Sequence, residues 1–133
     1  MDMSICRIDK RKSKLVFAGA ARPLYFIHNK ELKDTKGQGY PIGGHYGLMN
    51  LTYSETEVEI QKDDSFFIFS DGYADQFREW DKKKFTTKRF KALLTEICDE
   101  DMNTQKTKLD EAFMEWKGTG SQIDDILVIG IKI

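Results

Sequence analysis

Two short runs in this sequence are almost entirely apolar, and they restrict the fold more than any other feature. The first is Ser65-Phe-Phe-Ile-Phe69, and the second is Ile126-Leu-Val-Ile-Gly-Ile-Lys-Ile133. Such a run is typical of a strand that is covered on both faces of a sheet, because a half-buried strand alternates between apolar and polar residues. We therefore expect two central strands, at 65–69 and 126–133.

Further strands are predicted by alternating or β-rich segments. They lie at 3–8, 14–20, 23–28 and 56–60, with turn residues between them. A meander is the simplest arrangement of the first three. Residues 36–50 contain five glycines, which predicts a loop.

After residue 85 the apolar residues follow the spacing of amphipathic helices. Thr86 or Thr87 is the expected N-cap of the first helix, Asp101 or Asn103 that of the second, and Gly118 marks the end of the second. The apolar positions that define the two helices are Phe90, Leu93, Leu94 and Ile97, then Leu109, Ala112, Phe113 and Trp116.

The composition limits the class of protein. A length of 133 residues fits a single domain, residues 1–133. The 21 Lys and Arg residues balance 22 Asp and Glu residues, so we expect no nucleic-acid partner. Cys6 and Cys98 are far apart in the sequence, which favours two reduced thiols over a disulfide scaffold or a zinc site.

The location and extent of the protein follow from similar reasoning. No apolar run approaches the roughly 20 residues that a membrane-spanning helix needs, so we expect a cytoplasmic chain without a membrane segment. The opening Met1-Asp-Met-Ser-Ile-Cys6 enters a strand at once. We therefore expect the sequence to be part of a longer protein, whose other regions would be able to anchor it to a membrane.

Acidic residues stand at one end of each apolar strand. Asp71 follows the first strand, and Asp124 and Asp125 precede the second. If the two strands are antiparallel neighbours, these ends coincide, and a half-buried carboxylate cluster would need a divalent cation as counter-charge. Oxygen ligands favour magnesium or manganese over zinc. The alternative is an ordinary turn at Ser70-Asp-Gly72 and an ordinary cap before the last strand.

Two segments resemble motifs of a known family. Phe69-Ser-Asp-Gly-Tyr-Ala-Asp-Gln-Phe77 and Gln122-Ile-Asp-Asp-Ile-Leu-Val-Ile-Gly130 look like the last two motifs of the PPM-type, or type 2C, phosphatases. The closer match is the branch related to stage II sporulation protein E and the stress-response phosphatases. Further segments resemble that branch in the same order along the whole chain: Met1-Asp-Met3, Ala18-Gly-Ala-Ala-Arg-Pro23, Pro41-Ile-Gly-Gly44, Lys83-Lys-Phe85, and Gln105 through Trp116-Lys-Gly118.

The resemblance implies a fold and a site. The fold would be α+β, a β-sandwich with helices on one face, as in the PPM-type α-β-β-α fold without its N-terminal strand and first two long helices. Asp71 and Asp124 would be the catalytic residues. The metal site would comprise Asp71, Gly72, Asp124 and Asp125, with Asp125 orienting a metal-bound water or holding the loop. Two Mn²⁺ or Mg²⁺ ions would bind the phosphoester and activate a bridging water that attacks phosphorus.

The sequence also departs from the family pattern. An aspartate on an earlier strand and an Asp-x-x-Gly-His-Gly-like motif are not found in it. Leu127 stands where many relatives carry threonine, and Arg78-Glu-Trp-Asp81 replaces a glycine-rich turn. The isolated chain is therefore expected to lack part of the metal site. A sheet face without its covering helices would expose apolar surface, which favours a homodimer.

Three functional hypotheses follow. The first is a metal-dependent serine/threonine phosphatase output domain of bacterial signalling, attached to upstream sensor or signalling domains. Its substrate, by resemblance, would be a phosphorylated regulatory protein such as the antagonist of an anti-sigma factor. The second is a non-catalytic protein-interaction domain of the same fold. The third is an unrelated sandwich in which Asp71 and Asp124 lie far apart.

Other residues suggest functions less specifically. His28 and His45 could act as ligands, but single histidines at strand ends or in loops are more often structural. The basic run Lys82-Lys-Lys84 could bind an acidic partner or be a solvated loop. The aromatic series Tyr73, Phe77, Trp80 and Phe85 could form core or a docking surface.

Overall fold

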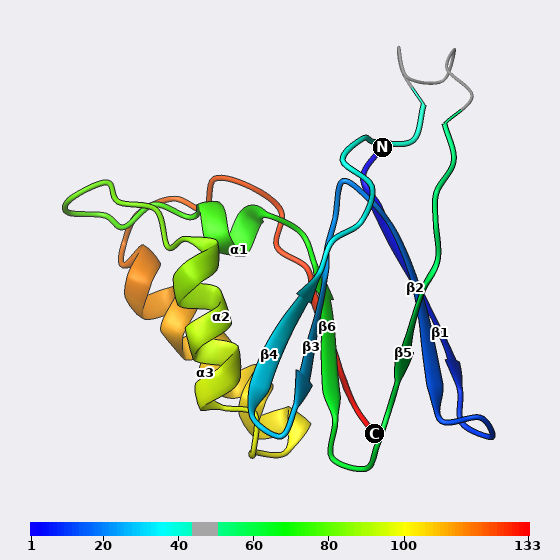
Figure 1. Cartoon of the computed structure of the whole chain (residues 1–133). Helices are drawn as coiled ribbons and strands as arrows, with labels where there is room; N and C mark the ends of the chain where they lie inside the picture. Colours follow the sequence, from blue (N-terminus) through cyan, green and yellow to red (C-terminus); the bar gives the residue numbers. More distant parts are fainter. Residues whose placement is uncertain (44–50) are drawn as a thin grey trace.

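The computed structural model describes residues 1–43 and 51–133, and two antiparallel sheets stack against each other in it (Figure 1). One sheet has the order β1-β2-β5, from β1 (Met3–Asp9), β2 (Lys14–Ala20) and β5 (Thr56–Glu59). The other has the order β4-β3-β6-β7, from β4 (Glu31–Thr35), β3 (Leu24–His28), β6 (Ser65–Phe69) and β7 (Val128–Lys132). The predicted α+β sandwich with helices on one face is confirmed.

The chain passes from one sheet to the other between β2 and β3, so the predicted meander of the first three strands is wrong. Ala21, in this connection, has a positive φ of 57°, a left-handed conformation that turns the chain out of the first sheet. The strand β4 was not predicted. It lies at the edge of its sheet and buries little of its polar sequence, so it lacks the apolar pattern that reveals a strand.

Two hydrophobic cores lie on opposite faces of the β4-β3-β6-β7 sheet. Between the sheets, Leu15, Phe17 and Phe66 belong to one core. On the other face, Phe67 and Phe69 pack with the helices. Successive residues of β6 therefore enter different cores, and its predicted burial on both faces is confirmed.

Three helices lie on the outer face of this sheet: α1 (Gly72–Asp75), α2 (Thr87–Glu96) and α3 (Met102–Lys117). The predicted ends of the two long helices are confirmed. Thr86 accepts a hydrogen bond from the Arg89 backbone N–H, Asp101 caps α3, and Gly118 ends it at a φ of 60°. Helix α1 was not predicted, because one turn is too short to show a helical period.

The strand β7 corrects the prediction of a second central, fully covered strand. Among the residues that the structure describes, β7 pairs with β6 alone and forms the edge of the sheet. Leu127, Ile129 and Ile131 are 57%, 42% and 38% exposed. Ile129 and Ile131 pair with Ile68 and Phe66, whose side chains face the first sheet. The β1-β2-β5 sheet has one strand fewer than the sheet it packs on, so it leaves the β7 edge of that sheet uncovered.

Several remaining predictions concern single residues. His28 Nδ1 lies 2.7 Å from Asp64 Oδ1, and its Nε2 lies 3.0 Å from Asn29 Nδ2, so both ring nitrogens are engaged at the strand end. His45 lies outside the described residues. Cys6 and Cys98 are free thiols, and burial raises the pKa of Cys6 to about 11. Within the described ranges, no helix has the length and apolar character needed to cross a bilayer.

The aromatic core under the helices should dominate stability. Phe90 is fully buried and contacts the rings of Tyr25, Phe69 and Tyr73 at centroid distances of 4.8 to 6.2 Å. We expect Phe90→Ala to lower the free energy of unfolding by about 3–5 kcal/mol, because it removes a ring and leaves a cavity. Urea denaturation measures this. The exposed Met114 is the control, and Met114→Ala should change stability by less than about 0.5 kcal/mol.

Candidate functional site

The end of β6 and the start of β7 meet, as the sequence predicts for antiparallel neighbours. Phe69 pairs with Val128, and the Ser70 backbone N–H donates to the Leu127 carbonyl at 2.9 Å. The Ser70 hydroxyl accepts from the Leu127 N–H and donates to the Asp125 carbonyl, both at 2.9 Å. Ser70 therefore holds the two predicted acidic segments side by side.

Gly72 lies directly against the second acidic segment. A Cβ atom on Gly72 would lie 2.4 Å from the Asp125 carbonyl oxygen, closer than any packed side chain can approach. Glycine is needed here because the two backbones touch. Asp71 and Gly72 on one side and Asp124 and Asp125 on the other are thus neighbouring loops, which excludes the hypothesis of widely separated acidic turns.

The Asp71 carboxylate is 46% exposed and stands at the N-terminus of α1 without capping it. Its Oδ2 atom accepts a hydrogen bond of 2.9 Å from Arg22 Nη2. The Arg22 guanidinium lowers the pKa of Asp71 against the opposing effect of desolvation. Arg22 therefore stabilises the ionised form of Asp71.

Arg22 was not predicted as a site residue. Its Nη2 atom also lies 2.8 Å from Asp2 Oδ2, so one guanidinium joins the start of β1, the β2–β3 connection and the end of β6. The backbone that carries it is tightly packed, because a Cβ on Gly19 or Gly37 would lie 2.3 or 2.4 Å from the Arg22 carbonyl oxygen. The sequence signal was that Arg22 lies in the segment 18–23, which resembles the family and contains small residues before the arginine, but which was given no role.

Asp124 and Asp125 are exposed and differ in their contacts. Asp124 Oδ1 accepts a hydrogen bond of 2.8 Å from the Asp125 backbone N–H, so one of its oxygens forms a local cap. The contact from Asp125 to Ser70 uses the backbone carbonyl. The Asp125 side chain is therefore not what joins the two loops.

The donor chemistry of this site suits a hard divalent cation, but the donors do not complete a coordination shell. Carboxylate oxygens are the ligands that Mg²⁺ and Mn²⁺ prefer. Across residues 1–43 and 51–133, no three His, Cys, Asp or Glu residues lie together as a group that could hold a metal ion. In addition, Arg22 already provides a positive charge at Asp71. The carboxylates at this site are therefore suitable donors for such a cation, but among the described residues they do not form a complete set of ligands.

Comparison with known proteins identifies the family. The family model described as stage II sporulation protein E (SpoIIE) matches residues 1–133. The chain belongs to the SpoIIE family. The resemblance to the sporulation branch of PPM-type phosphatases is thereby confirmed. No curated protein sequence matches the chain.

Solved structures of phosphatase domains share the fold. The SiaA-PP2C domain of Pseudomonas aeruginosa has a TM-score of 0.90 at 26% identity, over 99% of this chain and 51% of that one. The SpoIIE phosphatase domain of Bacillus subtilis, presoaked with Mn, has a TM-score of 0.73 at 15% identity, and the match covers 100% of this chain and 56% of that one. The RsbU and RsbW domains of a Mycobacterium tuberculosis protein have a TM-score of 0.76 at 15% identity, and the match covers 98% of this chain and 35% of that one. This chain thus spans about half the length of the first two structures and a smaller share of the third.

The contact between Gly72 and Asp125 generates a prediction. Gly72→Ala should destabilise the protein by about 1–3 kcal/mol, because the new methyl group forces the two acidic loops apart. Gly39→Ala is the matched control, since a Cβ there meets nothing within 4 Å. Urea denaturation compares them. Equal stability of the two variants would show that the loops do not depend on this contact.

Proposed function

We propose that residues 1–133 form part of a metal-dependent protein serine/threonine phosphatase domain. The observation that supports this most directly is the pairing of β6 with β7, which brings Asp71 and Gly72 against Asp124 and Asp125 in a chain of the SpoIIE family. The proposal includes the roles of these residues and the dependence on metal.

In this proposal Asp71 and Asp124 hold a divalent cation, Mn²⁺ or Mg²⁺, and the remaining ligands come from the part of the relatives' fold that this chain does not span. Such an ion, when bound, supplies positive charge to the phosphoryl group and lowers the pKa of a coordinated water. Gly72 allows the two acidic loops to approach. Asp125 orients the attacking water or supports its loop.

Arg22 has a distinct role in the proposed site. It stabilises the ionised form of Asp71, and its contacts with both carboxylates use a single nitrogen, Nη2. A guanidinium has five N–H donors, so as far as residues 1–43 and 51–133 are concerned its other donors can turn to phosphoryl oxygens next to Asp71. Arg22 thus positions the carboxylate and provides a surface that suits a phosphate group.

The proposed substrate is a phosphoserine or phosphothreonine on a regulatory protein of bacterial signalling, of the kind that antagonises an anti-sigma factor. The comparison with RsbU and RsbW domains supports a regulatory context. Upstream sensor or signalling domains and a cytoplasmic location are parts of the same proposal.

The second candidate is a non-catalytic interaction domain of the same fold. One observation favours it: Asp71 is paired with Arg22, and the described residues include no group of three metal-ligating side chains. Such a domain would bind its partner without hydrolysing a phosphoester. Turnover and metal binding therefore discriminate between the two functions.

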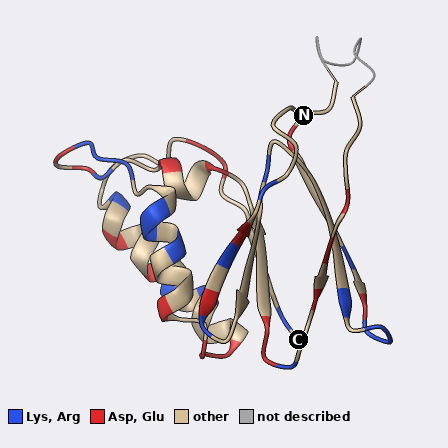
Figure 2. Cartoon of the chain, viewed as in Figure 1, with Lys and Arg blue, Asp and Glu red and all other residues tan. Residues whose placement is uncertain are grey.

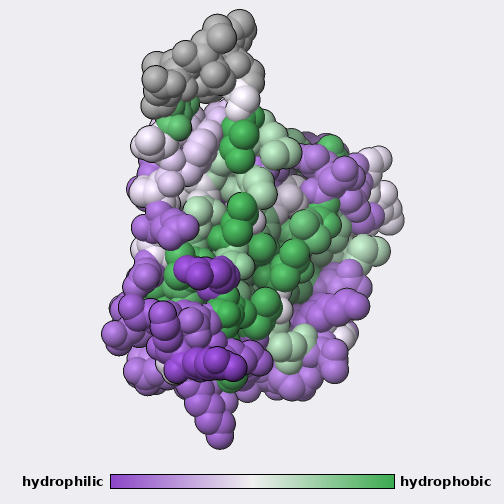
Figure 3. Space-filling model, turned by 90° about the vertical axis from the view of Figure 1, so that its right-hand side faces the viewer, coloured by the Kyte–Doolittle hydropathy of each residue, from purple (hydrophilic) through white to green (hydrophobic). Residues whose placement is uncertain are grey.

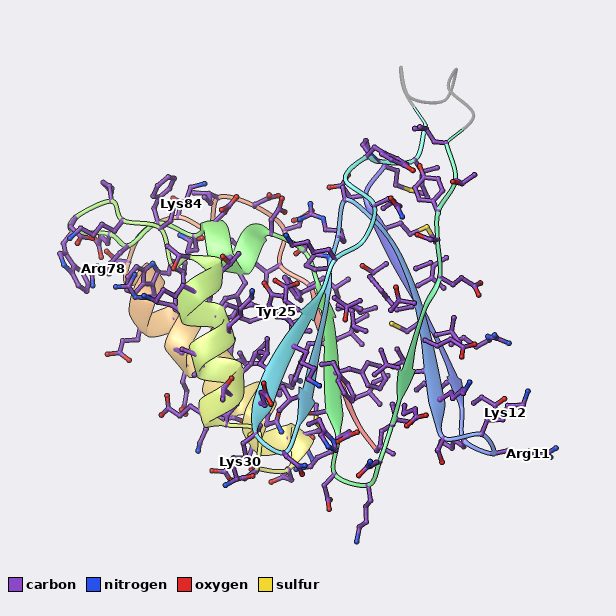
Figure 4. The ribbon with its side chains drawn as sticks, in the orientation of Figure 1. Arg11, Lys12, Tyr25, Lys30, Arg78 and Lys84 are labelled. Carbon is purple, nitrogen blue, oxygen red and sulfur yellow. The ribbon has the colours of Figure 1, made fainter. Side chains whose placement is uncertain are left out.

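Asp71→Asn tests the phosphatase proposal. We expect it to reduce Mn²⁺-dependent hydrolysis of p-nitrophenyl phosphate on the order of 100-fold or more in the full-length gene product, because it removes a charged metal ligand. Calorimetry should show weaker Mn²⁺ binding. Asp99→Asn is the control, because Asp99 is exposed and pairs with Lys30 at the opposite end of the helical layer (Figure 4). Unchanged turnover in Asp71→Asn would remove this residue from the mechanism.

A second copy of the chain is the proposed partner for the outer face of the β1-β2-β5 sheet. Ile5 is exposed on this face beside Ala18, its partner on β2, and Figure 3 shows apolar residues gathered there. Soluble monomers seldom expose large apolar patches. Light scattering of the chain at high micromolar concentration should show a dimer, and Ile5→Glu should shift it to monomer. A monomeric wild type would contradict this proposal.

A further inference from the structure

The segment between α1 and α2, residues 77–84, forms a loop that projects from the helical side of the molecule (Figure 1). Its two ends are held together, because Phe77 and Lys84 form an antiparallel bridge and the Arg78 N–H donates to the Lys83 carbonyl at 2.9 Å. Lys82, at the turn, has a positive φ of 54°. The 77–84 loop is therefore a hairpin-like structure with a defined conformation.

The acidic residues of the 77–84 loop are engaged within the protein. Asp81 pairs with Arg78, whose Nε donates to Asp81 Oδ1 at 2.8 Å. Glu79 accepts hydrogen bonds from the backbone N–H of Thr119, at 2.9 Å, and from its hydroxyl, which ties the loop to the segment after α3. These contacts neutralise or occupy both carboxylates.

Trp80 and the lysines of the loop face solvent, whereas Arg78 is part-buried. Trp80 is 69% exposed, and the side chain of Lys83 is also 69% exposed although its Nζ lies 3.4 Å from Asp81 Oδ2. Arg78 lies between two indole rings, with its guanidinium carbon 4.5 Å from the Trp80 ring centre and 4.4 Å from that of Trp116. This stacking fixes one face of Trp80. The loop thus offers an ordered aromatic ring next to the exposed lysines Lys82 and Lys83.

The loop also lies beside the candidate site. It begins directly after the short helix α1, which Asp71 starts. Lys84 Nζ lies 3.1 Å from Asp75 Oδ1 at the end of that helix. Figures 2 and 4 show this basic loop at the same end of the molecule as α1. The base of the loop therefore lies next to α1, and a segment bound along the loop could extend from its tip toward the helix that begins at Asp71.

We propose that the 77–84 loop is a docking surface for the phosphorylated partner protein, and that it binds an acidic segment next to the phosphorylated residue. The proposal rests on the proposed phosphatase function and specifies its substrate. Exposed tryptophans are frequent anchors of protein interfaces, and complementary charges give specificity and faster association. A protein segment is favoured over nucleic acid because the whole chain has a net charge of −1.

Charge reversal on the loop is the central test. The probe is a short synthetic phosphoserine peptide with glutamates on both sides and one leucine, and its binding is followed by tryptophan fluorescence, since the chain has two tryptophans. The double variant Lys82→Glu/Lys83→Glu should weaken binding about tenfold, and added salt should weaken binding to wild type. Trp80→Phe should lose most of the fluorescence change, with Trp116 as internal reference.

The matched control is Arg11→Glu/Lys12→Glu. Arg11 and Lys12 are exposed basic neighbours in the β1–β2 turn, far from the 77–84 loop in Figure 4. Both double variants change the net charge equally, so an effect of total charge would weaken peptide binding in both. Equal weakening in the two variants, or none in Lys82→Glu/Lys83→Glu, would overturn the docking proposal. So would a single-stranded oligonucleotide that binds the loop more tightly than the peptide.

Turnover of p-nitrophenyl phosphate separates this proposal from the proposed function. This small ester has no flanking segment to dock, so the full-length Lys82→Glu/Lys83→Glu variant should hydrolyse it at the wild-type rate. If no protein form hydrolyses it but peptide binding still depends on the two lysines, the phosphatase function fails and the docking surface stands. If turnover is normal and the peptide binds wild type and Lys82→Glu/Lys83→Glu equally well, only the docking proposal fails.

Discussion

The clamp that Ser70 forms between β6 and β7 is the interaction on which the candidate site depends. Its backbone and hydroxyl make three hydrogen bonds to the Asp125–Leu127 segment, all of 2.9 Å. These bonds link residues more than fifty positions apart and fix the end of a central strand against the start of an edge strand. The β6–β7 pairing ends at Phe69 and Val128, so the bonds of Ser70 extend the contact between the two segments to the acidic loops themselves.

The sequence predicts the elements whose local pattern is strong, and it fails where the structure depends on distant contacts. The β6 run, the caps at Thr86 and Asp101, and Gly118 were found because each has a local signal. The edge position of β7 was not found, because an apolar run does not show how many strands lie beside it. The passage between sheets depends on the left-handed conformation of Ala21, which alanine does not reveal in a sequence.

The same division applies to the site. Motif resemblance singled out Asp71, Gly72, Asp124 and Asp125, and the structure places them on neighbouring loops. Arg22 was missed because its importance comes from contacts with Asp2 and Asp71, 20 and 49 residues away in the sequence. The segment 18–23 resembles the family, but the pairs that give Arg22 its role join distant parts of the chain, so the role becomes visible only in the fold.

The cationic residues around the site divide into two groups with different physical consequences. Arg22 is part-buried between Asp2 and Asp71, so its charge acts over short distances and stabilises the ionised form of Asp71. Lys82 and Lys83 are exposed, and salt screens their charges beyond about 10 Å. In the proposed function, the part-buried cation suits a fixed point next to Asp71, whereas the exposed ones suit the capture of a mobile acidic segment. Arg22 contacts the residue that begins α1, and the loop that carries Lys82 and Lys83 is joined to the end of α1 through Lys84.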